Sequence, residues 1–346
     1  MGRTSNGCKL YCDETELRAC SGSGVMAGST IDVLEIIIPE SQAGIRLDKV
    51  LAKLFPAYSR SQLQQWLKEG RIQVDDYLPL LRQAAQGGEI VRIQVPVSDP
   101  SEWQAQDLPL KVVHEDEHLI VLDKPTGLVV HPGAGNPNGT LANALLYRFP
   151  ETTNLPRAGV VHRLDKDTSG LLVVARTAIA RQQLIRDLEH HRVVRMYAAI
   201  VNGRILAGGR ITQPIGRHPR DRLRMAVNEK GKKAVTEFRV EKRFRAHTQL
   251  RVELETGRTH QIRVHFSHRG NPLLGDPRYG GRLRIPKGVS AALAAELRGF
   301  RRQALHAREL SFAHPDSGDQ MTFASPLPDD LEQLIVVLTA DQALST

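Results

Sequence analysis

Cysteine, aromatic side chains and long apolar runs are all scarce in this sequence of 346 residues. The three cysteines are Cys8, Cys12 and Cys20, so the rest of the chain has no thiol with which to build a disulfide framework. Aromatic residues make up only 5%, which argues against a large aromatic ligand cage. No run of about 18 uncharged apolar residues occurs, so we expect no membrane-spanning helix. These absences predict a cytoplasmic protein with no membrane association.

The first 30 residues are predicted to be a disordered extension. They are polar and lack the apolar stretch that a secretory signal needs. Their cysteine spacing, C-x3-C-x7-C, offers three thiolates, but no histidine stands nearby to complete a tetrahedral zinc site. We therefore predict no bound metal ion.

Positive charge is in excess, with 47 Lys and Arg against 38 Asp and Glu and a net charge of +9. Residues 217–245 alone hold 11 Lys and Arg and 4 Asp and Glu. More basic residues follow at Arg278, Arg282, Arg284, Lys287, Arg298, Arg301 and Arg302. An excess of this size cannot be fully paired within the protein, so a polyanionic partner such as a nucleic acid is indicated.

Residues 31–97 are predicted to form a small domain with the order strand, helix, helix, strand, strand. IDVLEIII (31–38) has the pattern of a strand, and Leu47, Val50, Leu51 and Leu54 repeat at helical spacing. Ser59 is placed to cap a second helix that ends at Gly70. RIQV (71–74) and EIVRIQVP (89–96) complete the unit as two strands.

This segment resembles the alpha-L RNA-binding module that ribosomal proteins share with tyrosyl-tRNA synthetases. The resemblance rests on RLDKVLAKLFPAYSRSQLQQWLKEGRIQVDD followed by GGEIVRIQV. It implies RNA contacts by Arg46, Lys49, Ser59, Arg60, Ser61 and Gln62. A helix that begins at a Ser-Arg-Ser turn also offers backbone N–H groups and a guanidinium to phosphate. The pair Asp75-Asp76 stands where the module usually has an Asn-Gly turn.

Residues 98–110 are polar, contain two prolines and are predicted to be a linker. A second domain then runs over residues 111–346. Its Val- and Ile-rich segments are predicted strands at 119–125, 170–177, 196–201, 234–244 and 248–257, and helical patterns cover only 140–149 and 177–191. Strands that follow one another with few helices between them predict a mixed, mainly antiparallel β-sheet. The fold class is therefore α+β.

Polar residues interrupt two apolar segments in RAGVVHRLDKDTSGLLVVART (157–177), where a catalytic loop is predicted. Three chemistries fit its residue types. Asp165 and Asp167 could be a glycosidase pair, although residues two apart in an extended segment face opposite ways. Ser169 with His162 could belong to a hydrolase, but the G-x-S-x-G elbow is missing. A single aspartate could act with an arginine that holds it ionised.

The candidate arginine lies in LETGRTHQIRVHFSHRGNPLLGDPRYGG (254–281). Arg258, His260, Arg263 and His265 stand close together here. If the segment is a strand, alternation places Gln261, Arg263 and His265 on one side. An arginine can pair bidentately with a carboxylate and never loses its proton, so either Arg258 or Arg263 could hold the aspartate charged.

HRLDKDTSGLLVVART, RMYAAIVNG and the 254–281 segment together resemble the RluA-type family of RNA pseudouridine synthases that act on large-subunit ribosomal RNA. VVHPGAGNPNGT (129–140) and RQALHARELSFAHP (302–315) extend the resemblance. It implies that Asp165 is the catalytic aspartate, that Tyr197 stacks on the target base, and that Arg263 pairs with the aspartate. It also implies RNA contacts by Arg163, which would enter the helix when the base leaves, and by Arg258.

The resemblance implies isomerisation of uridine in 23S rRNA or its precursor: the base leaves the stack, its N1 parts from C1′ of ribose, and it rejoins through C5. No group is gained or lost, so no cofactor is expected, and we expect a monomer. Asp165 could attack ribose, attack uracil or remove a ribose proton. The alternatives are a non-catalytic ribosome-assembly factor, a synthase for another rRNA or tRNA site, and a nucleic-acid glycosylase.

Overall fold

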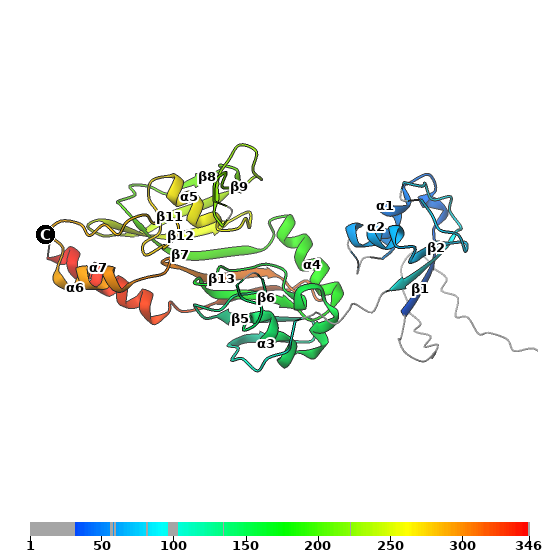
Figure 1. The fold of residues 1–346 in the computed structure, drawn as a ribbon, viewed down its shortest axis with the longest axis horizontal. Coiled ribbons are helices and arrows are strands. Elements are labelled where there is room, and N and C mark those ends of the chain that lie inside the picture. Colours follow the sequence, from blue (N-terminus) through cyan, green and yellow to red (C-terminus); the bar gives the residue numbers. More distant parts are fainter. Residues whose placement is uncertain are drawn as a thin grey trace, which may run out of the picture. The chain divides into compact units, whose positions relative to one another are not determined.

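A computed structural model describes residues 32–55, 58, 60–80, 82–95, 103–133, 135–221 and 223–344 (Figure 1). The chain divides into two compact units, one containing residues 32–95 and the other containing residues 103–152 and 156–344. The predicted extension over residues 1–30 lies outside the described residues, as do residues 98–102 of the predicted linker.

The first unit is a three-stranded sheet with two helices. Its elements are β1 (Asp32–Ile37), the 3-10 turn η1 (Glu40–Gln42), α1 (Leu47–Leu54), α2 (Arg60–Lys68), β2 (Ile72–Val74) and β3 (Ile90–Val95). The strands are antiparallel in the order β1-β3-β2. The apolar faces of both helices, including Leu51 and Trp66, are buried against strand residues such as Val91. Gly70, with φ of +71°, follows α2 as its stop.

The second unit is built on a nine-stranded sheet. Its strands are β4 (Val112–Glu115), β5 (Leu119–Lys124), β6 (Ser169–Ala175), β7 (Val194–Asn202), β8 (Gly209–Ile211), β11 (Thr236–Arg243), β12 (His247–Leu254), β13 (Leu305–Ala313) and β14 (Gln320–Ala324). The order is β4-β5-β6-β13-β7-β12-β11-β8, with β14 paired to β13. Only β6 and β13 run parallel, so the predicted mixed and mainly antiparallel sheet is confirmed.

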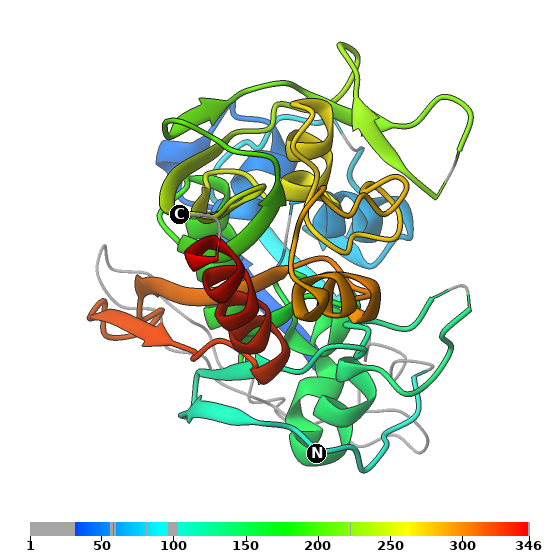
Figure 2. The ribbon, with the colours of Figure 1, turned by 90° about the vertical axis from the view of Figure 1, so that its left-hand side faces the viewer.

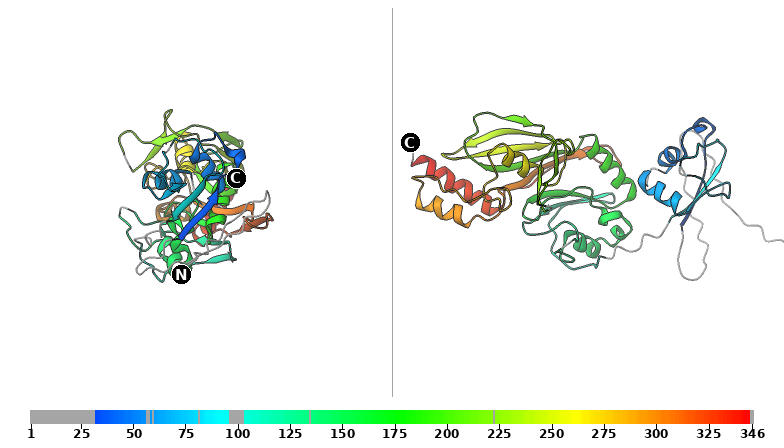
Figure 3. Two further views of the ribbon diagram at one scale, coloured as in Figure 1. Left: turned by 90° about the vertical axis from the view of Figure 1, so that its right-hand side faces the viewer. Right: turned by 45° about the horizontal axis from the view of Figure 1, so that its top comes forward.

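Helices cover both faces of this sheet. They are α3 (Leu141–Arg148), α4 (Ala178–Glu189), α5 (Gln261–His268), α6 (Ala291–Gly299) and α7 (Asp329–Ala343), with 3-10 turns η2 (Pro150–Asn154) and η3 (Pro156–Gly159). The even-numbered residues of β5 and β6, such as Leu172, share a core with α3 and α5, whereas the odd-numbered ones, such as Val173, pack against α4. Figures 2 and 3 show α6 and α7 side by side at one end of the unit.

A two-stranded hairpin of β9 (Ile215–Arg217) and β10 (Met225–Val227) stands apart from the main sheet. Its second strand and its turn belong to the basic segment 217–245, which begins at the last residue of β9. Its inner residues Ile215 and Met225 pack with Val264 of α5 and with Tyr279. The most basic part of the sequence is therefore attached to the helix that carries Arg263.

Residues 103–110 belong to the second unit, although the sequence assigned them to the linker. Trp103 is partly buried against the main core, where its ring lies 5.9 Å from that of His131. The Gln104 carbonyl accepts a hydrogen bond from Asn143 (2.7 Å), and the Gln106 side chain accepts one from the Gly139 N–H (2.7 Å). The polar composition of this segment does not indicate these contacts. The linker therefore ends before Trp103, not at residue 110 as predicted.

Residues 261–265 form the start of α5, so the strand considered for them is wrong. Three alternating polar residues cannot distinguish a strand from a helix. The apolar residues decide the outcome, because Ile262 and Phe266, four apart, both enter the main core. On the helix Arg263 and His265 diverge, and the buried His265 instead contacts the Thr236 hydroxyl and the Gln213 carbonyl, each at 2.9 Å.

Candidate active site

The loop that contains Asp165 ends where β6 begins, beside the start of β13. The parallel pairing joins Ser169 to His306 and Gly170 to Ala307. Gly170 has φ of +110°, and a Cβ there would overlap the carbonyl oxygen of Ala307. Only glycine allows so close an approach, which is why the polar loop can turn sharply into a fully buried strand.

Three side chains from two neighbouring segments hold this loop in place. Buried Lys124, at the end of β5, donates its ammonium hydrogens to the carbonyls of Pro125 (2.8 Å), Leu128 (2.9 Å) and Lys166 (3.0 Å). Gln303 donates to the Thr168 hydroxyl (3.0 Å), and Arg302 donates to the Asp167 carbonyl (3.4 Å) while pairing with Asp330 of α7 (2.6 Å). Asp165 therefore stands on a backbone that is restrained from both sides.

Lys124 is only 1% exposed, and burial lowers its pKa from 10.5 to about 8 against the attraction of Asp165 and Asp167. Below pH 8 Lys124 is protonated in both the folded and the unfolded chain. The folded state then bears the whole free-energy cost of burying the charged ammonium group. Between pH 8 and 10.5 the unfolded chain binds more protons, so stability rises with pH.

We expect the free energy of unfolding of the natural protein to rise by about 2 kcal/mol between pH 8 and 10, relative to Lys124→Met. The measurement is denaturant unfolding at both pH values. The variant removes the titrating group, so its own pH dependence is the control. Parallel pH dependence in the two proteins would show that Lys124 titrates normally.

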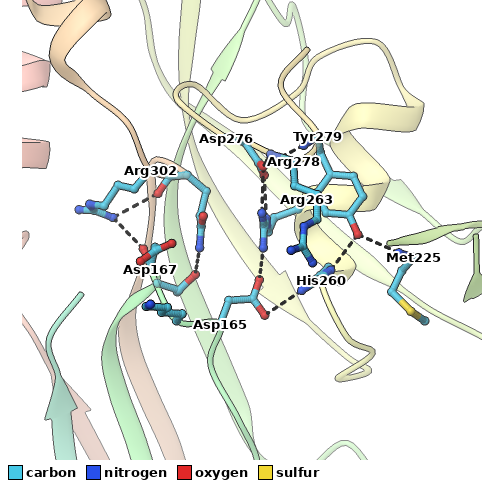
Figure 4. Close-up of polar contacts among 12 residues, drawn as sticks. Asp165, Asp167, Met225, His260, Arg263, Asp276, Arg278, Tyr279 and Arg302 are labelled. Carbon is cyan, nitrogen blue, oxygen red and sulfur yellow. Dashed lines mark hydrogen bonds and ion pairs between the residues drawn. The ribbon is translucent and has the colours of Figure 1, made fainter. Parts of the chain in front are cut away.

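Asp165 shares one arginine with a second, fully buried carboxylate (Figure 4). Arg263 donates from Nη1 to Asp165 Oδ2 (2.8 Å), and from Nε and Nη2 to the two oxygens of Asp276 (2.7 and 2.9 Å). Asp276 also accepts hydrogen bonds from the backbone N–H groups of Arg278 and Tyr279, each at 2.9 Å. The guanidinium is thereby fixed by Asp276 and presents its remaining edge to Asp165.

The electrostatics of this triad favour charged side chains. Burial opposes the charge of Arg263, yet its hydrogen bonds to Asp276 and the attraction of Asp165 raise the pKa of the guanidinium above its usual value. Burial works against Asp276 too, but Arg263 lowers the pKa of that carboxyl below its ordinary value. The guanidinium of Arg263, a permanent cation, lies 2.8 Å from Asp165 and is aimed at its carboxylate.

His260 faces the other oxygen of Asp165. Its Nε2 lies 3.8 Å from Asp165 Oδ1, and its Nδ1 lies 2.8 Å from the Tyr279 hydroxyl (Figure 4). That hydroxyl already accepts the N–H of Met225 (2.9 Å), so its own hydrogen is available for His260 Nδ1. Burial lowers the pKa of His260, despite the attraction of Asp165, which favours a neutral ring with its hydrogen on Nε2. The β9–β10 hairpin thus reaches Asp165 through two side chains.

Tyr197 and Asp165 line the same cleft, whose volume is about 760 Å³. Tyr197 lies on β7, is 6% exposed, and packs within the main core. Burial raises the pKa of Tyr197, so the phenol keeps its proton at neutral pH. A smaller hollow next to the cleft is lined by Asp165, Tyr197, Ile262 and Arg263. The three residues predicted to be catalytic are therefore brought together.

Arg163 and Arg258 are exposed residues of the same cleft. Among the described residues no carboxylate pairs with either, and the Arg258 guanidinium donates to the Lys233 carbonyl (3.0 Å). Both side chains line the cleft, and their predicted contacts with RNA stay predictions.

In the first unit, Arg46 and Arg60 converge on the buried carboxylate of Asp48. Arg46 donates to both oxygens of Asp48 (3.1 Å each), and Arg60 donates twice to Oδ2 (3.0 and 2.6 Å). Their side chains remain 42% and 44% exposed, so each can also reach a ligand, and Lys49 is exposed beside them. Ser59 lies outside the described residues, and so do the side chains of Ser61 and Gln62.

We expect Asp48→Asn to destabilise the first unit by about 2 kcal/mol at pH 7. Burial opposes ionisation, but hydrogen bonds from Arg60, Gln64 and Arg46 lower the pKa of Asp48 from 3.8 to about 2. This stability is complete above pH 3.8 and is lost as the pH falls towards 2. Denaturation followed by Trp66 fluorescence, in a Trp103→Phe background, measures it. Equal stability of variant and parent at pH 7 would contradict this account.

Several functional residues were missed by sequence reasoning. Asp276 and Tyr279 stand in the quoted segment GDPRYGG, but nothing in their spacing reveals that they support Arg263 and His260. Lys124 is the second residue after the apolar run of the predicted strand LIVLDKP (119–125), and a lysine so close to a buried run was a signal that could have been used.

With this geometry in hand, comparison with known proteins shows the class. The family model described as RNA pseudouridylate synthase matches residues 118–268, and the S4 domain model matches residues 45–76. The chain belongs to the RNA pseudouridine synthase family, in the group that carries an N-terminal S4 domain.

Three similar proteins carry the same name. "Ribosomal large subunit pseudouridine synthase D" of Xanthomonas campestris is 53% identical over 309 residues, which cover 89% of this chain and 93% of the relative. The proteins of that name from Pseudomonas aeruginosa and Escherichia coli O157:H7 are 53% and 50% identical, over 88% and 89% of this chain and 95% of each relative. The solved human RNA pseudouridylate synthase domain containing 4 covers 66% of this chain and 93% of its own, with 25% identity and a TM-score of 0.52.

Among the described residues, none of the helices is both long and apolar enough to span a membrane. In the same residues, groups of three or more His, Cys, Asp or Glu placed to hold a metal ion are absent.

Proposed function

We propose that this protein converts specific uridines of large-subunit ribosomal RNA, within 23S rRNA, to pseudouridine. The observation that supports it most is the placement of Asp165, which is held by Arg263 in a cleft that Tyr197 also lines. The ribosomal substrate is suggested by the shared name of the relatives, which are half identical to this chain over most of its length.

The target uridine must leave its helix to reach Asp165, because the carboxylate lies inside a cleft. Extruding a base costs a few kcal/mol in lost stacking and pairing. Arg163 is exposed at the cleft and has a planar guanidinium that can stack in the gap left by the base. Tyr197, with its phenol protonated, offers an aromatic face and a hydrogen-bond donor to the extruded uracil.

The reaction breaks the bond from ribose C1′ to uracil N1 and forms a bond from C1′ to C5. The hydrogen of C5 is lost to solvent and N1 gains one, so the RNA mass is unchanged. Asp165 can attack ribose, attack uracil or remove a ribose proton. Each route needs the carboxylate, and the same Arg263 contact supports all three. No redox change or group transfer to a second molecule takes place, so no cofactor is part of the proposal.

The S4 domain and the β9–β10 hairpin supply basic surface on which the RNA can be held. We infer that the enzyme works in the cytoplasm as a monomer. Deleting residues 1–100 separates two roles of the first unit. Changed modification sites would indicate that it selects the target, and weaker binding at the same sites would indicate that it only tethers the RNA.

The test of the proposed reaction is tritium release from 23S rRNA transcripts labelled at C5 of uridine. Release by the natural protein is the expected result, because C5 loses its hydrogen when it becomes the new attachment point. Tight RNA binding without release would contradict the proposal and favour an assembly factor. Free uracil in place of released tritium would instead indicate a glycosylase.

A further inference from the structure

One of the arginines that line the cleft, Arg195, is buried, and none of the described carboxylates pairs with it. It lies on β7 two residues before Tyr197, so the two side chains extend from the same face of the strand. Arg195 is only 6% exposed and lines the cleft together with Asp165 and Tyr197. It is the one arginine lining this cleft that is buried, since Arg157, Arg163 and Arg258 are all exposed.

The guanidinium of Arg195 is incompletely used within the described part of the chain. Its hydrogen bonds there both come from Nη2 and reach the carbonyls of Leu254 (3.2 Å) and Glu255 (3.3 Å), at the end of β12. Its Nε is buried and has no acceptor. No carboxylate of the described residues lies within ion-pairing distance, in contrast to Arg263, which has two.

An arginine in this position is a net cost to the folded protein when nothing binds to it. A buried charge that lacks a counter-ion is destabilising, and carbonyl dipoles compensate only part of the loss. Burial lowers the pKa of Arg195 from its usual value, but a guanidinium remains protonated at neutral pH. The guanidinium of Arg195 fits in this place because residue 257 is a glycine. A Cβ at Gly257 would lie only 2.7 Å from Arg195 Nη1.

The rest of the cleft lining is also short of negative charge. Four arginines line it, at positions 157, 163, 195 and 258, and its only carboxylates are Asp165 and Glu189. Asp165 is already paired with Arg263. The field of Arg195 extends to its neighbours, since burial and then the charge of Arg195 lower the pKa of His162 to about 3. An anion that enters this cleft therefore meets the buried, unpaired guanidinium of Arg195, with the neutral side chain of His162 nearby.

We propose that Arg195 binds a phosphodiester group of the RNA strand next to the extruded uridine, and so anchors the target nucleotide inside the cleft. The inference rests on the proposed function. It identifies the RNA phosphodiester as the anion that pairs with Arg195. The free Nη1 edge of the guanidinium can donate to a phosphate oxygen, and a charge-assisted bond of this kind is strong in a buried setting. The phosphodiester therefore supplies the counter-ion that Arg195 lacks within the described part of the protein.

The first test compares Arg195→Met with the natural protein on unmodified 23S rRNA transcripts. Met keeps most of the volume and removes the charge. We expect kcat/KM to fall about 10- to 100-fold, mainly through KM, because charge-assisted hydrogen bonds to the anion are lost. We expect the melting temperature to stay level or rise, because an unpaired buried charge is removed. Arg195→Lys, which keeps the charge, should recover part of kcat/KM.

Arg251→Met is the matched control. Arg251 lies on the neighbouring strand β12, away from the cleft, and pairs with Glu309 (3.6 Å). It should leave kcat/KM unchanged. If Arg195→Met and Arg195→Lys both lower the melting temperature by several degrees, Arg195 is a structural residue and the proposal is overturned. Unchanged kcat/KM in Arg195→Met overturns it as well.

The second test identifies the phosphate. Once the modified uridine has been mapped, short RNA substrates are made with one neutral methylphosphonate at each position around it. At one position the substitution should lower kcat/KM of the natural protein about tenfold and have no further effect in Arg195→Met. Additive losses at every position would contradict the proposal. An inactive natural protein would instead contradict the proposed function, so the two failures are distinguishable.

Discussion

Asp165→Asn should lower the rate of pseudouridine formation by at least about a thousandfold while RNA affinity changes by less than about threefold. The amide keeps the size of the side chain but can act neither as a nucleophile nor as a base. Arg263 remains fixed by Asp276, so the cleft keeps its shape when its contact to Asp165 weakens. Single-turnover tritium release and filter binding measure the two quantities.

Asp167→Asn is the control for this experiment. Asp167 belongs to the same loop, but Arg263 contacts Asp165. Arg302 contacts Asp167 through its backbone carbonyl, which the substitution leaves in place. It should retain most of the activity. If Asp165→Asn stays active, Asp165 is not the catalytic group. If RNA binding is lost together with activity, the substitution has disturbed the cleft.

Arg263→Met should destabilise the second unit by about 3–5 kcal/mol at pH 7 and abolish activity. Asp276 is 3% exposed and would lose both hydrogen bonds from the guanidinium, while Asp165 would lose its cation. For a unit of this size the loss corresponds to a fall in melting temperature of roughly 10 °C. Calorimetry on the full-length protein measures it.

The double variant Arg263→Met, Asp276→Asn separates the causes. It removes the buried charge that the single variant leaves without a partner, so part of the stability should return. Activity should stay absent, because Asp165 still lacks the arginine. A single variant with unchanged stability would show that Asp276 is not charged in the folded protein.

Several strands of the main sheet, and the position of the loop that carries Asp165, were predictable from the sequence. Apolar runs such as GLLVVART (170–177) are long enough to identify strands without tertiary information. The polar interruption before that strand marked Asp165. The need of an isolated aspartate for a cation pointed to the arginines of residues 254–281, and the family resemblance then singled out Arg263.

The support for the site was not predictable, because it comes from tertiary contacts between distant segments. Lys124 reaches a carbonyl 42 residues away, and Gln303 reaches a hydroxyl 135 residues away. The α5 helix was considered as a strand because its polar residues alternate over three positions, whereas its burial against the sheet follows Ile262 and Phe266. Local pattern carries no information about such partners.

The charge of the first unit shows the same limit. Arg46 and Arg60 were predicted from resemblance to contact RNA, but no local pattern indicates that one buried carboxylate, Asp48, holds both. Asp48 fixes the direction of the two guanidinium groups without covering them. The RNA contacts of these residues remain predictions.

Asp165, together with Arg263 and Tyr197, is proposed to isomerise uridine within RNA. Nucleoside analysis of a 23S rRNA transcript, digested after incubation with the natural protein or with Asp165→Asn, tests it most directly. The account predicts that pseudouridine appears in an amount equal to the uridine lost, with no free uracil, and only with the natural protein. Uridine that is unchanged, or replaced by free uracil and abasic sites, would contradict it.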